Sequence, residues 1–479
     1  MNSLLKFAKY GAGGIFALLS FWLTAGNLAA TQMKRKPDAQ LAAFIADSLA
    51  KRPDYNESAL RLRELGIGMG LDVASGVDEE TEQQITQELR AKNPNYAEQS
   101  QAFEAIQEEL DQYIQSQLNN PQDGFTAIPE TLATFLAQHQ TQIREIQNHL
   151  ATQPAPTWYL PESVITVFES RDMGLIASVA LPSFLNQVQL NRVLLLQLIQ
   201  DNQAGLAAEV NRGAQASWKL AGSSTTGLTL IAELVQVINE NLTAGILRKV
   251  DQVPLALPEN WVSDPTEAGI LKSLEYEFLG FQYAGMSGLR LSDLTVFSQV
   301  SGADHSPVRY AGVPEQLFWP ADLFFRPYFI FSAINSLEYS MANLNAFRVN
   351  PPNICDPNFQ VETLETLGGG QIGWWNILGQ IATPAFLTQP LKGLQRGLSL
   401  ELTEQVLKAK ASAAQEGAWP QTLPNLKSQI CPGTNWEYTV AADGSLTLEL
   451  GSYSPWLAER LTPDPEGRSN YPPLVFYSQ

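Results

Sequence analysis

The sequence predicts a mainly α-helical protein with an N-terminal transmembrane helix, a helical hairpin, a larger multi-helix domain and a small C-terminal β-hairpin. Three observations predict this class. Apolar residues recur every three to four positions over most of the chain, an uncharged apolar segment stands at the front, and strict alternation appears near the end. With 479 residues, of which 44% are hydrophobic and 16% charged, the chain can bury substantial cores.

The first element is the uncharged segment between Lys9 and Lys34. Its 24 residues, YGAGGIFALLSFWLTAGNLAATQM, exceed the roughly 20 that a helix needs to cross a bilayer. A cleaved secretory signal has the same order of basic and apolar regions, but Leu28 and Leu23 stand where a cleavage site needs small residues. We expect residues 1–36 to form an uncleaved anchor in membrane lipid, with a cleaved signal and a merely buried helix as the alternatives.

Charge is distributed unevenly along the chain. The formal net charge is −19, and the remainder of the chain carries about −24 once the basic front is set aside. Such a body repels phosphate backbones over a screening length of about 10 Å, so we expect no nucleic-acid partner. The basic residues that precede the first acid, Asp38, are Lys6, Lys9, Lys34, Arg35 and Lys36.

Residues 37–151 predict short helices followed by a helical hairpin. Two stretches with apolar residues at helical spacing, 103–118 and 132–150, are joined by a Pro-Gly-containing turn at 121–124. The segment ATQPAPTWYLP, residues 151–161, then marks a domain boundary, because its prolines remove helix donors and restrict the residues before them.

Residues 161–417 predict a multi-helix domain. Three helices fall between Pro182 and about Val250, and a further helix follows an aspartate cap. Residues 285–320 are punctuated by Gly, Ser and Pro, which is typical of a functional loop. A Pro-interrupted helical region begins at the Trp-Trp pair, 374–375, and ends at Gly417.

The most aromatic segment of the chain follows the long loop. Asp322 and Arg326 lie inside it, and a charge near a bilayer centre costs about 2.5–3.5 kcal/mol on insertion scales. We therefore predict a core helix rather than a second span, with contact to a membrane surface as the next alternative. Its candidate interaction surface consists of Phe324, Phe325, Tyr328 and Phe329.

Residues 418–479 predict a β-hairpin and a C-terminal tail. The runs NWEYTV and SLTLEL alternate apolar and polar residues, and Asp443-Gly444 supplies the positive φ that a tight hairpin needs. A lone two-stranded hairpin is marginal in water, so its apolar face must lie on the preceding helix.

The chain has two cysteines, Cys355 and Cys431, both in Pro-containing turns outside the helical patterns. A bridge between them would close a long loop and add roughly 4 kcal/mol in the chain-entropy model. Disulfides persist outside the cytosol. We favour this disulfide, and with it an extracytoplasmic body, over two unrelated reduced thiols.

The C-terminal motif resembles a known pattern. The match lies at Gly417, Trp419, Pro420 and Leu423, and then at Pro432 and Tyr438. It is similar to the end of a group of uncharacterised bacterial membrane-anchored helical proteins, and locally to the close of type II secretion pseudopilins. Cys431 stands where that pattern has an aspartate, which argues against a cation at the turn. The resemblance, which extends to the helices of residues 211–242, implies a tethered helical fold and no known activity.

The recognised motifs for nucleotide binding, zinc hydrolysis, serine hydrolysis and calcium binding do not occur, so we expect no cofactor and no metal. His139 and His149 point about 80° apart at 100° per helical residue, so they share no metal face. We expect His139 to be a hydrogen-bonded interface histidine and His305 a solvated loop residue. Paired carboxylates are common. The acids near the linker are Glu162, Glu169 and Asp172, and those on the predicted helix after the aspartate cap are Glu275 and Glu277.

These observations predict a single-pass membrane protein, with its soluble body in the periplasm or another extracytoplasmic compartment. We expect it to act by binding other membrane or envelope proteins, as a scaffold, assembly factor or accessory subunit, rather than as an enzyme. One alternative is a cell-envelope polymer hydrolase that uses paired carboxylates around the 285–320 loop. Another alternative is a pseudopilin-like secretion component. The roughly 400 residues between the anchor and the hairpin disfavour this alternative.

Overall fold

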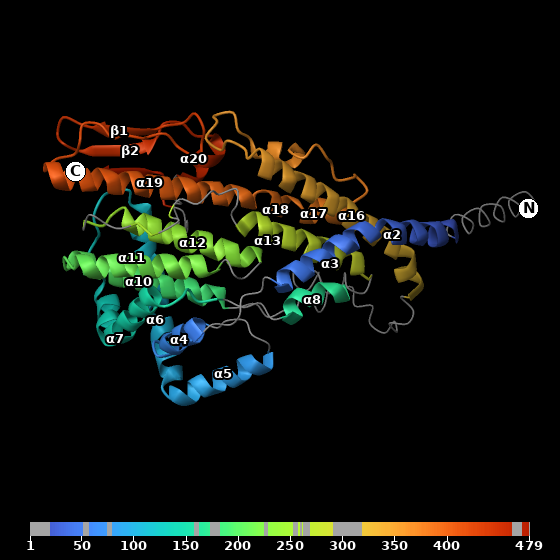
Figure 1. Ribbon diagram of the computed structural model, residues 1–479, viewed down its shortest axis with the longest axis horizontal. Helices are drawn as coiled ribbons and strands as arrows, with labels where there is room; N and C mark the ends of the chain where they lie inside the picture. The colour runs from blue at the N-terminus through green and yellow to red at the C-terminus, as the bar shows by residue number, and fades with distance from the viewer. Residues whose placement is uncertain are drawn as a thin grey trace, which may run out of the picture.

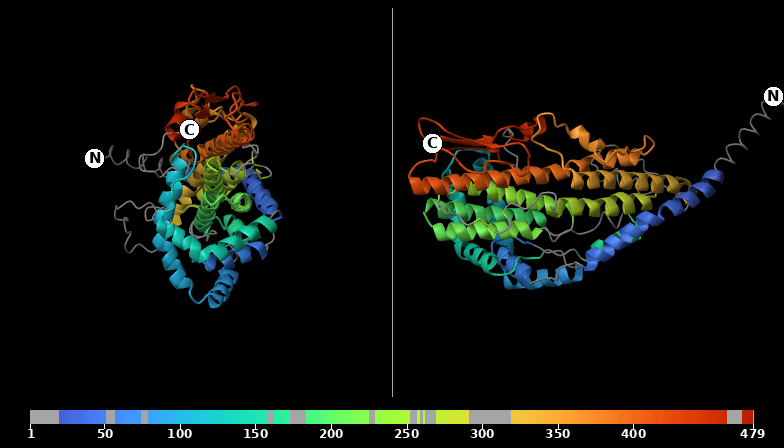
Figure 2. Two further views of the ribbon diagram at one scale, coloured as in Figure 1. Left: turned by 90° about the vertical axis from the view of Figure 1, so that its left-hand side faces the viewer. Right: turned by 45° about the horizontal axis from the view of Figure 1, so that its top comes forward.

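Long helices lying side by side make up most of the computed structural model (Figure 1). This agrees with the predicted mainly α-helical class. The N-terminal helix enters the body at one end, and a small sheet lies toward the other (Figures 1 and 2). The structure describes residues 20–50, 57–73, 79–157, 162–172, 183–224, 229–251, 257–258, 261, 269–290, 319–461 and 472–478. Residues 1–19, with much of the predicted membrane span, and most of the 285–320 loop lie outside the described residues.

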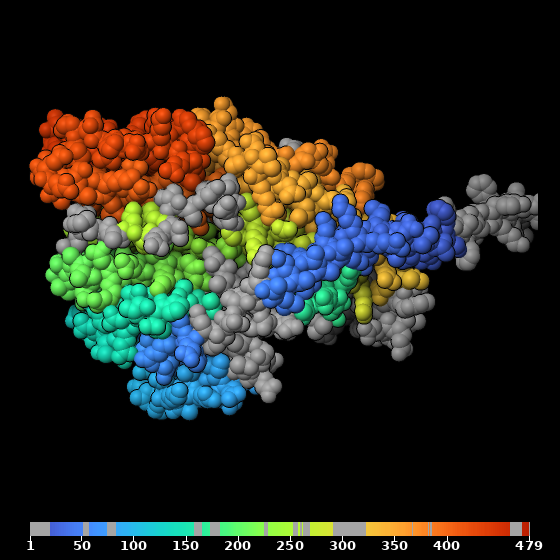
Figure 3. All heavy atoms as spheres, in the orientation of Figure 1, coloured from blue at the N-terminus to red at the C-terminus, as the bar shows by residue number. Residues whose placement is uncertain are grey.

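The N-terminal part runs along the surface of one end of the body. A π-helical turn, η1 (Trp22–Gly26), leads into α2 (Asn27–Met33) and then α3 (Arg35–Ala50). Figure 3 shows these helices on the visible face, at the right-hand end. α3 packs against α8 (Glu162–Ser170) and a second π-helical segment, η3 (Phe278–Gly285).

The predicted helical hairpin is present, and two shorter helices accompany it. Its turn is closed by Tyr113, whose hydroxyl donates to the Thr126 carbonyl at 2.9 Å. The apolar stripes of the hairpin are buried, as their spacing predicts. The four helices are α4 (Glu57–Ile67), α5 (Glu79–Lys92), α6 (Tyr96–Asn119) and α7 (Glu130–Thr152).

Three helices predicted between 182 and 250 form the centre of the body: α10 (Phe184–Gln203), α11 (Ala207–Ser223) and α12 (Leu230–Leu247). Thr229 caps α12 by accepting a hydrogen bond from the Ala232 amide, as a threonine at this position commonly does. Most residues of α12 are buried all round, which is the pattern of a core helix.

The aromatic segment forms one long helix, α16 (Trp319–Val349), as predicted. It packs on α13 (Gly269–Glu277), η3 and the short α14 (Met286–Gly288). Small buried side chains, Ala333, Ser336 and Ser340, recur along it. Small residues at helical spacing let neighbouring helices approach closely.

The segment after α16 contains short helices and then a long one. The predicted Pro-interrupted region divides into α17 (Ile377–Ala382), α18 (Pro384–Leu387) and α19 (Gln389–Glu416), after a 3₁₀ turn, η5 (Val361–Thr366). α19 ends at Gly417, as predicted, because this glycine takes the left-handed conformation at φ 72°.

The C-terminal sheet has three antiparallel strands in the order β1-β2-β3. β1 (Trp436–Val440) and β2 (Leu446–Leu450) are the predicted hairpin, with Gly444 at φ 89° in the turn. The tail, predicted without structure, instead contributes β3 (Val475–Ser478), which pairs Phe476 with Leu448. Four residues of alternation were too short a signal to predict that strand.

Among the described residues, buried apolar side chains form two hydrophobic clusters. One surrounds α13, η3, α16 and the sheet, and the other joins α4, α6, α7, α10 and α11. α12 and α19 contribute to both clusters: Val237 and Leu398 belong to the first, Leu242 and Leu400 to the second. These two helices therefore link the halves of the body. The predicted division at 1–36, 37–151, 161–417 and 418–479 stays a prediction.

Candidate functional site

The four aromatic residues of the predicted interaction surface lie together on the N-terminal half of α16, at different depths. Phe329 is 3% exposed, whereas Phe325 is 38% exposed. Phe324 and Tyr328 are half-buried. Their rings form a connected row, with centroids 5.3 Å apart for Phe324 and Phe325 and 5.8 Å for Tyr328 and Phe329. Only Phe325 therefore presents much of its ring to solvent.

The N-terminal half of α16 packs against the N-terminal helix. The Trp22 indole donates a hydrogen bond to the Phe324 carbonyl at 2.9 Å, and its ring lies 6.3 Å from that of Phe331. A Cβ on Gly26 would stand 3.5 Å from the Pro327 ring, so the helices touch at that point. Residues about 300 positions apart in sequence thus join at the end where the chain enters the body.

The outer face of the entering helix is uncharged and exposes large apolar side chains. Phe21 is 69% exposed and Leu28 is 63% exposed, and residues 20–33 carry no charge. Exposed apolar side chains that gather on one surface are typical of interaction sites or membrane contacts. Basic residues follow directly at Lys34, Arg35 and Lys36, of which the last two are exposed.

The base of this helix is a network of charges. Burial and the nearby Arg171 guanidinium lower the pKa of Lys34, while Asp38 opposes this shift. Arg171 donates to Asp38 at 2.6 Å, and the Tyr283 hydroxyl also donates to Asp38. Burial raises the pKa of Tyr283, and its hydrogen bond to the Asp38 carboxylate adds to the effect. This network ties α3 to η3 and to the residue that follows α8.

Beside α16, a short segment exposes a further apolar surface, which we call the tryptophan platform: Trp374, Trp375, Ile377 and Ile381. Trp374 is 87% exposed, Ile381 74% and Ile377 60%. Trp375 is 37% exposed, and its ring lies 6.4 Å from that of Tyr328, which connects the platform to the aromatic row of α16.

Hydrogen bonds to α16 hold the platform. The buried Asn376 amide donates to the Ser332 carbonyl at 3.0 Å and to the Ser336 hydroxyl at 2.9 Å, and its oxygen caps α17 by accepting from Gly379. The Asn335 side chain accepts from the Gly373 amide at 3.1 Å. The exposed residues therefore stand on a well-tied backbone.

The predicted disulfide is present between Cys355 and Cys431, 76 residues apart. Both cysteines are fully buried, and the bond joins the segment after α16 to the turn before β1. Next to it, the buried Glu401 carboxylate of α19 accepts from the Ser428 hydroxyl and the Gln429 amide, each at 2.7 Å. It also accepts from the Ile430 amide and the Trp436 indole. The turn before the hairpin is thus attached covalently to the segment after α16 and by hydrogen bonds to α19.

Among the described residues, Glu233 and Glu277 are acids buried within the body. Burial raises the pKa of Glu233 to about 8, with Arg396 opposing and Glu240 adding to the shift. A Cβ on Gly269 would lie 2.0 Å from the Glu233 carboxylate, so backbone packs directly on that group. Burial likewise raises the pKa of Glu277 to about 7. Glu275 instead pairs with Arg348 at 2.8 Å, near the surface.

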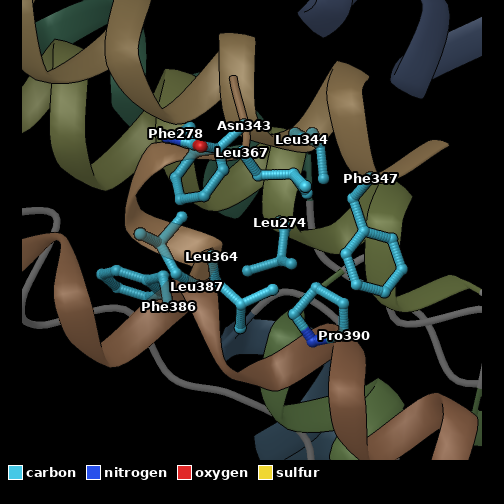
Figure 4. A pocket seen from close by; sticks show the side chains of 10 residues that line it. All are labelled: Leu274, Phe278, Asn343, Leu344, Phe347, Leu364, Leu367, Phe386, Leu387 and Pro390. Carbon is cyan, nitrogen blue, oxygen red and sulfur yellow. The ribbon is translucent and has the colours of Figure 1, made fainter. Parts of the chain in front are cut away.

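A small pocket between α13, α16 and α19 is apolar (Figure 4). It measures about 20 Å³, which is room for about one water molecule. The one polar side chain among its lining residues, Asn343, already donates to the Tyr339 carbonyl and accepts from the Gly368 amide. Figure 4 shows Leu274, Phe347 and Pro390 around it. This cavity suits neither a substrate nor an ion.

No protein-family model, curated protein or solved structure matches this chain. The resemblance of the C-terminal motif therefore stays a prediction.

The described histidines occupy separate environments, and in the described part of the chain no group of His, Cys, Asp or Glu could hold a metal ion. His139 packs on Phe135 with ring centroids 4.6 Å apart, and its buried Nδ1 has no hydrogen-bond partner there, so the predicted hydrogen bond is not made through this nitrogen. His149 Nε2 lies 2.9 Å from the Ser58 hydroxyl and ties α7 to α4. Burial lowers the pKa of both histidines. His305 lies outside the described residues.

Sequence reasoning missed the tryptophan platform. It treated residues 374–417 as one interrupted helix, and apolar residues in a helix are ordinarily expected to face a core. One signal was available, because residues 366–391 contain no charged residue in an otherwise acidic chain. Among the described residues, α12 is the one helix both long and apolar enough to cross a membrane, and 83% of that window is buried in the body, as in a core helix.

Proposed function

We propose that this protein is tethered to a membrane through its N-terminal segment and that its disulfide-braced helical body lies in an extracytoplasmic space. There it binds other membrane or envelope proteins, as a scaffold, assembly factor or accessory subunit. The observation that carries the proposal is the uncharged helix of residues 20–33, which exposes Phe21, Leu28 and Met33 at the end where the chain enters the body.

The charge pattern of this end supports a membrane tether. Residues 10–33 are uncharged, long enough to span a bilayer, and flanked by Lys9 and by Lys34 to Lys36. Basic side chains at the ends of an apolar helix lie favourably at the level of lipid headgroups. In a soluble body, Phe21 and Leu28 would remain in water, where apolar surface of this extent is unfavourable.

The disulfide supports the extracytoplasmic compartment, because reducing systems in the cytosol keep most thiols free. The shape of the body supports a binding role. The long helices α10, α11, α12 and α19 run along one axis and give the body an elongated form (Figure 2). No observation on the described residues favours the hydrolase or the pseudopilin alternative.

The test begins with the location of the full-length protein. Membranes are separated from cytosol and washed with alkaline carbonate, and thiols are alkylated with and without prior reduction. We expect the protein in the washed membranes, with Cys355 and Cys431 alkylated only after reduction. Recovery in the cytosol with both thiols reactive would refute the tether and the compartment together.

The binding role is tested by cross-linking in native membranes, gentle solubilisation and mass spectrometry of the copurified proteins. We expect a reproducible set of membrane or envelope partners. These partners should be lost when the cross-linker is omitted and a harsh detergent is used. A body that purifies alone under every gentle condition would contradict the binding role while leaving the tether in place.

A further inference from the structure

We propose that the tryptophan platform is a second membrane contact, which inserts Trp374, Trp375, Ile377 and Ile381 into the headgroup boundary of a lipid bilayer. This inference rests on the proposed tether and adds to it a surface that holds the body at a fixed attitude to the bilayer. The occupant is the surface of the same bilayer that holds the N-terminal segment.

The first argument is the form of the exposed surface. Trp374 is 87% exposed and Ile381 is 74% exposed. Trp374 stands in the short loop before α17, and Ile381 stands on α17, a helix of six residues. Protruding aromatic and aliphatic side chains do not need a shaped partner to become buried, because a bilayer adapts to them. Tryptophan is enriched at the membrane interface, where its ring is buried and its N–H stays near water.

The second argument is rigidity. The platform is tied to α16 through the buried Asn376, by bonds to Ser332 and Ser336, and through Asn335. Because the backbone is held, the exposed side chains keep their direction, and burying them in lipid requires little ordering of the chain. A loosely held loop could instead fold its apolar residues back onto the body.

The third argument is charge. Residues 366–391, which include the platform, carry no charge on a chain with net charge −19. A bilayer surface that carries anionic lipids repels an acidic protein surface. The platform lies within this uncharged segment and is therefore a part of the body that can approach such a bilayer closely.

The fourth argument is placement. α17 and α2 both pack on α16, and they lie at the same end of the molecule (Figure 1). The ring contacts from Trp22 to Phe324 and from Trp375 to Tyr328 join both surfaces to one helix. A bilayer that receives the N-terminal segment is therefore close to the platform, whereas a protein partner would have to enter between the platform and that bilayer.

The test uses full-length protein reconstituted into liposomes of phosphatidylcholine and phosphatidylglycerol, with or without brominated acyl chains. A cysteine is introduced by Ile381→Cys and labelled with an environment-sensitive fluorophore, since the native cysteines are bonded to each other. Val349→Cys is the matched control, because Val349 is an exposed aliphatic residue, 87% exposed, at the far end of α16.

We expect the label at 381 to be quenched several-fold more by brominated lipid than the label at 349, and less by aqueous iodide. Adding Trp374→Ser to the Ile381→Cys chain should reduce the lipid quenching, while flotation with the liposomes stays unchanged. Equal iodide quenching at both positions in floating protein would overturn the second contact and leave the tether standing.

Two further outcomes are distinguishable. Protein that does not float with liposomes would refute the tether and, with it, this inference. A label at 381 that is shielded from iodide in native membranes but is not quenched by brominated lipid in liposomes would assign the platform to a protein partner and overturn the lipid contact.

Discussion

Buried charged side chains in this protein are held by specific partners. Arg248 lies entirely inside the body and donates to the Ser399 and Pro473 carbonyls and to the Thr403 hydroxyl, at 2.7–2.8 Å. Burial lowers its pKa to about 9. Glu401 accepts hydrogen bonds from four donors around the turn before β1. Such groups stabilise a fold only while every partner is in place.

Glu233 should make stability depend on pH. Its pKa in the folded protein is raised to about 8, above its ordinary value of 4.5, so its full contribution is present below about pH 4.5 and is lost as pH rises toward 8. At about 1.4 kcal/mol per pKa unit, the loss is a few kcal/mol. Glu233→Gln should remove this part of the slope in urea unfolding measured between pH 5 and 8.

The control for this prediction is Glu169→Gln, which replaces an exposed acid and should leave the slope of the natural protein unchanged. A Glu233→Gln protein with the same pH dependence as the parent would show that the carboxyl is ionised without penalty in the folded state.

Removal of the Glu401 side chain should weaken the attachment of the hairpin. Glu401→Ala leaves two amides, a hydroxyl and an indole without their acceptor in a buried site, and we expect a loss of about 3–5 kcal/mol in the free energy of unfolding. Glu401→Gln, which keeps one acceptor oxygen, should lose less. Equal losses in the two variants, by chemical denaturation, would contradict this role.

At the scale of elements, the sequence predicts most helices correctly because their apolar residues recur at helical spacing over long stretches. Three helices between 182 and 250, the hairpin of α6 and α7 and the end of α19 at Gly417 follow from such local signals. β3 and the tryptophan platform did not, because each is short. Their positions depend on partners distant in sequence: β2 for Phe476 and α16 for Asn376.

The disulfide connects two elements and should matter to the free energy of unfolding. For a closed loop of 76 residues, the chain-entropy model gives roughly 4–5 kcal/mol. The free energy of unfolding of the Cys355→Ser/Cys431→Ser double variant should therefore be lower by that amount, and the variant should unfold at a lower urea concentration. Reducing agent should lower the stability of the natural protein to a similar degree and leave the double variant unchanged, which calorimetry with and without reductant can check.

At the scale of the whole molecule, orientation depends on a small difference in charge across the proposed span. Lys6 and Lys9 lie on one side of it, and Lys34, Arg35 and Lys36 on the other. Because basic residues favour the cytoplasmic side, this near balance makes the topology sensitive to single changes.

We therefore expect Lys6→Gln/Lys9→Gln to reduce the fraction of protein molecules whose helical body lies outside the cytoplasm. Arg35→Gln/Lys36→Gln should increase that fraction. Protease accessibility in intact spheroplasts measures that fraction. Two variants that behave alike would show that flanking charge does not set the orientation.

β3 also has a consequence for the order of assembly. Its Tyr477 amide bonds the Pro121 carbonyl, Gln122 pairs with the same residue, and Arg248 holds the Pro473 carbonyl close by. This contact therefore forms a seam whose two sides are more than 350 positions apart in the chain. A ribosome or translocon that has released only the helices leaves that seam open, so the body can close only after residues 472–478 have emerged.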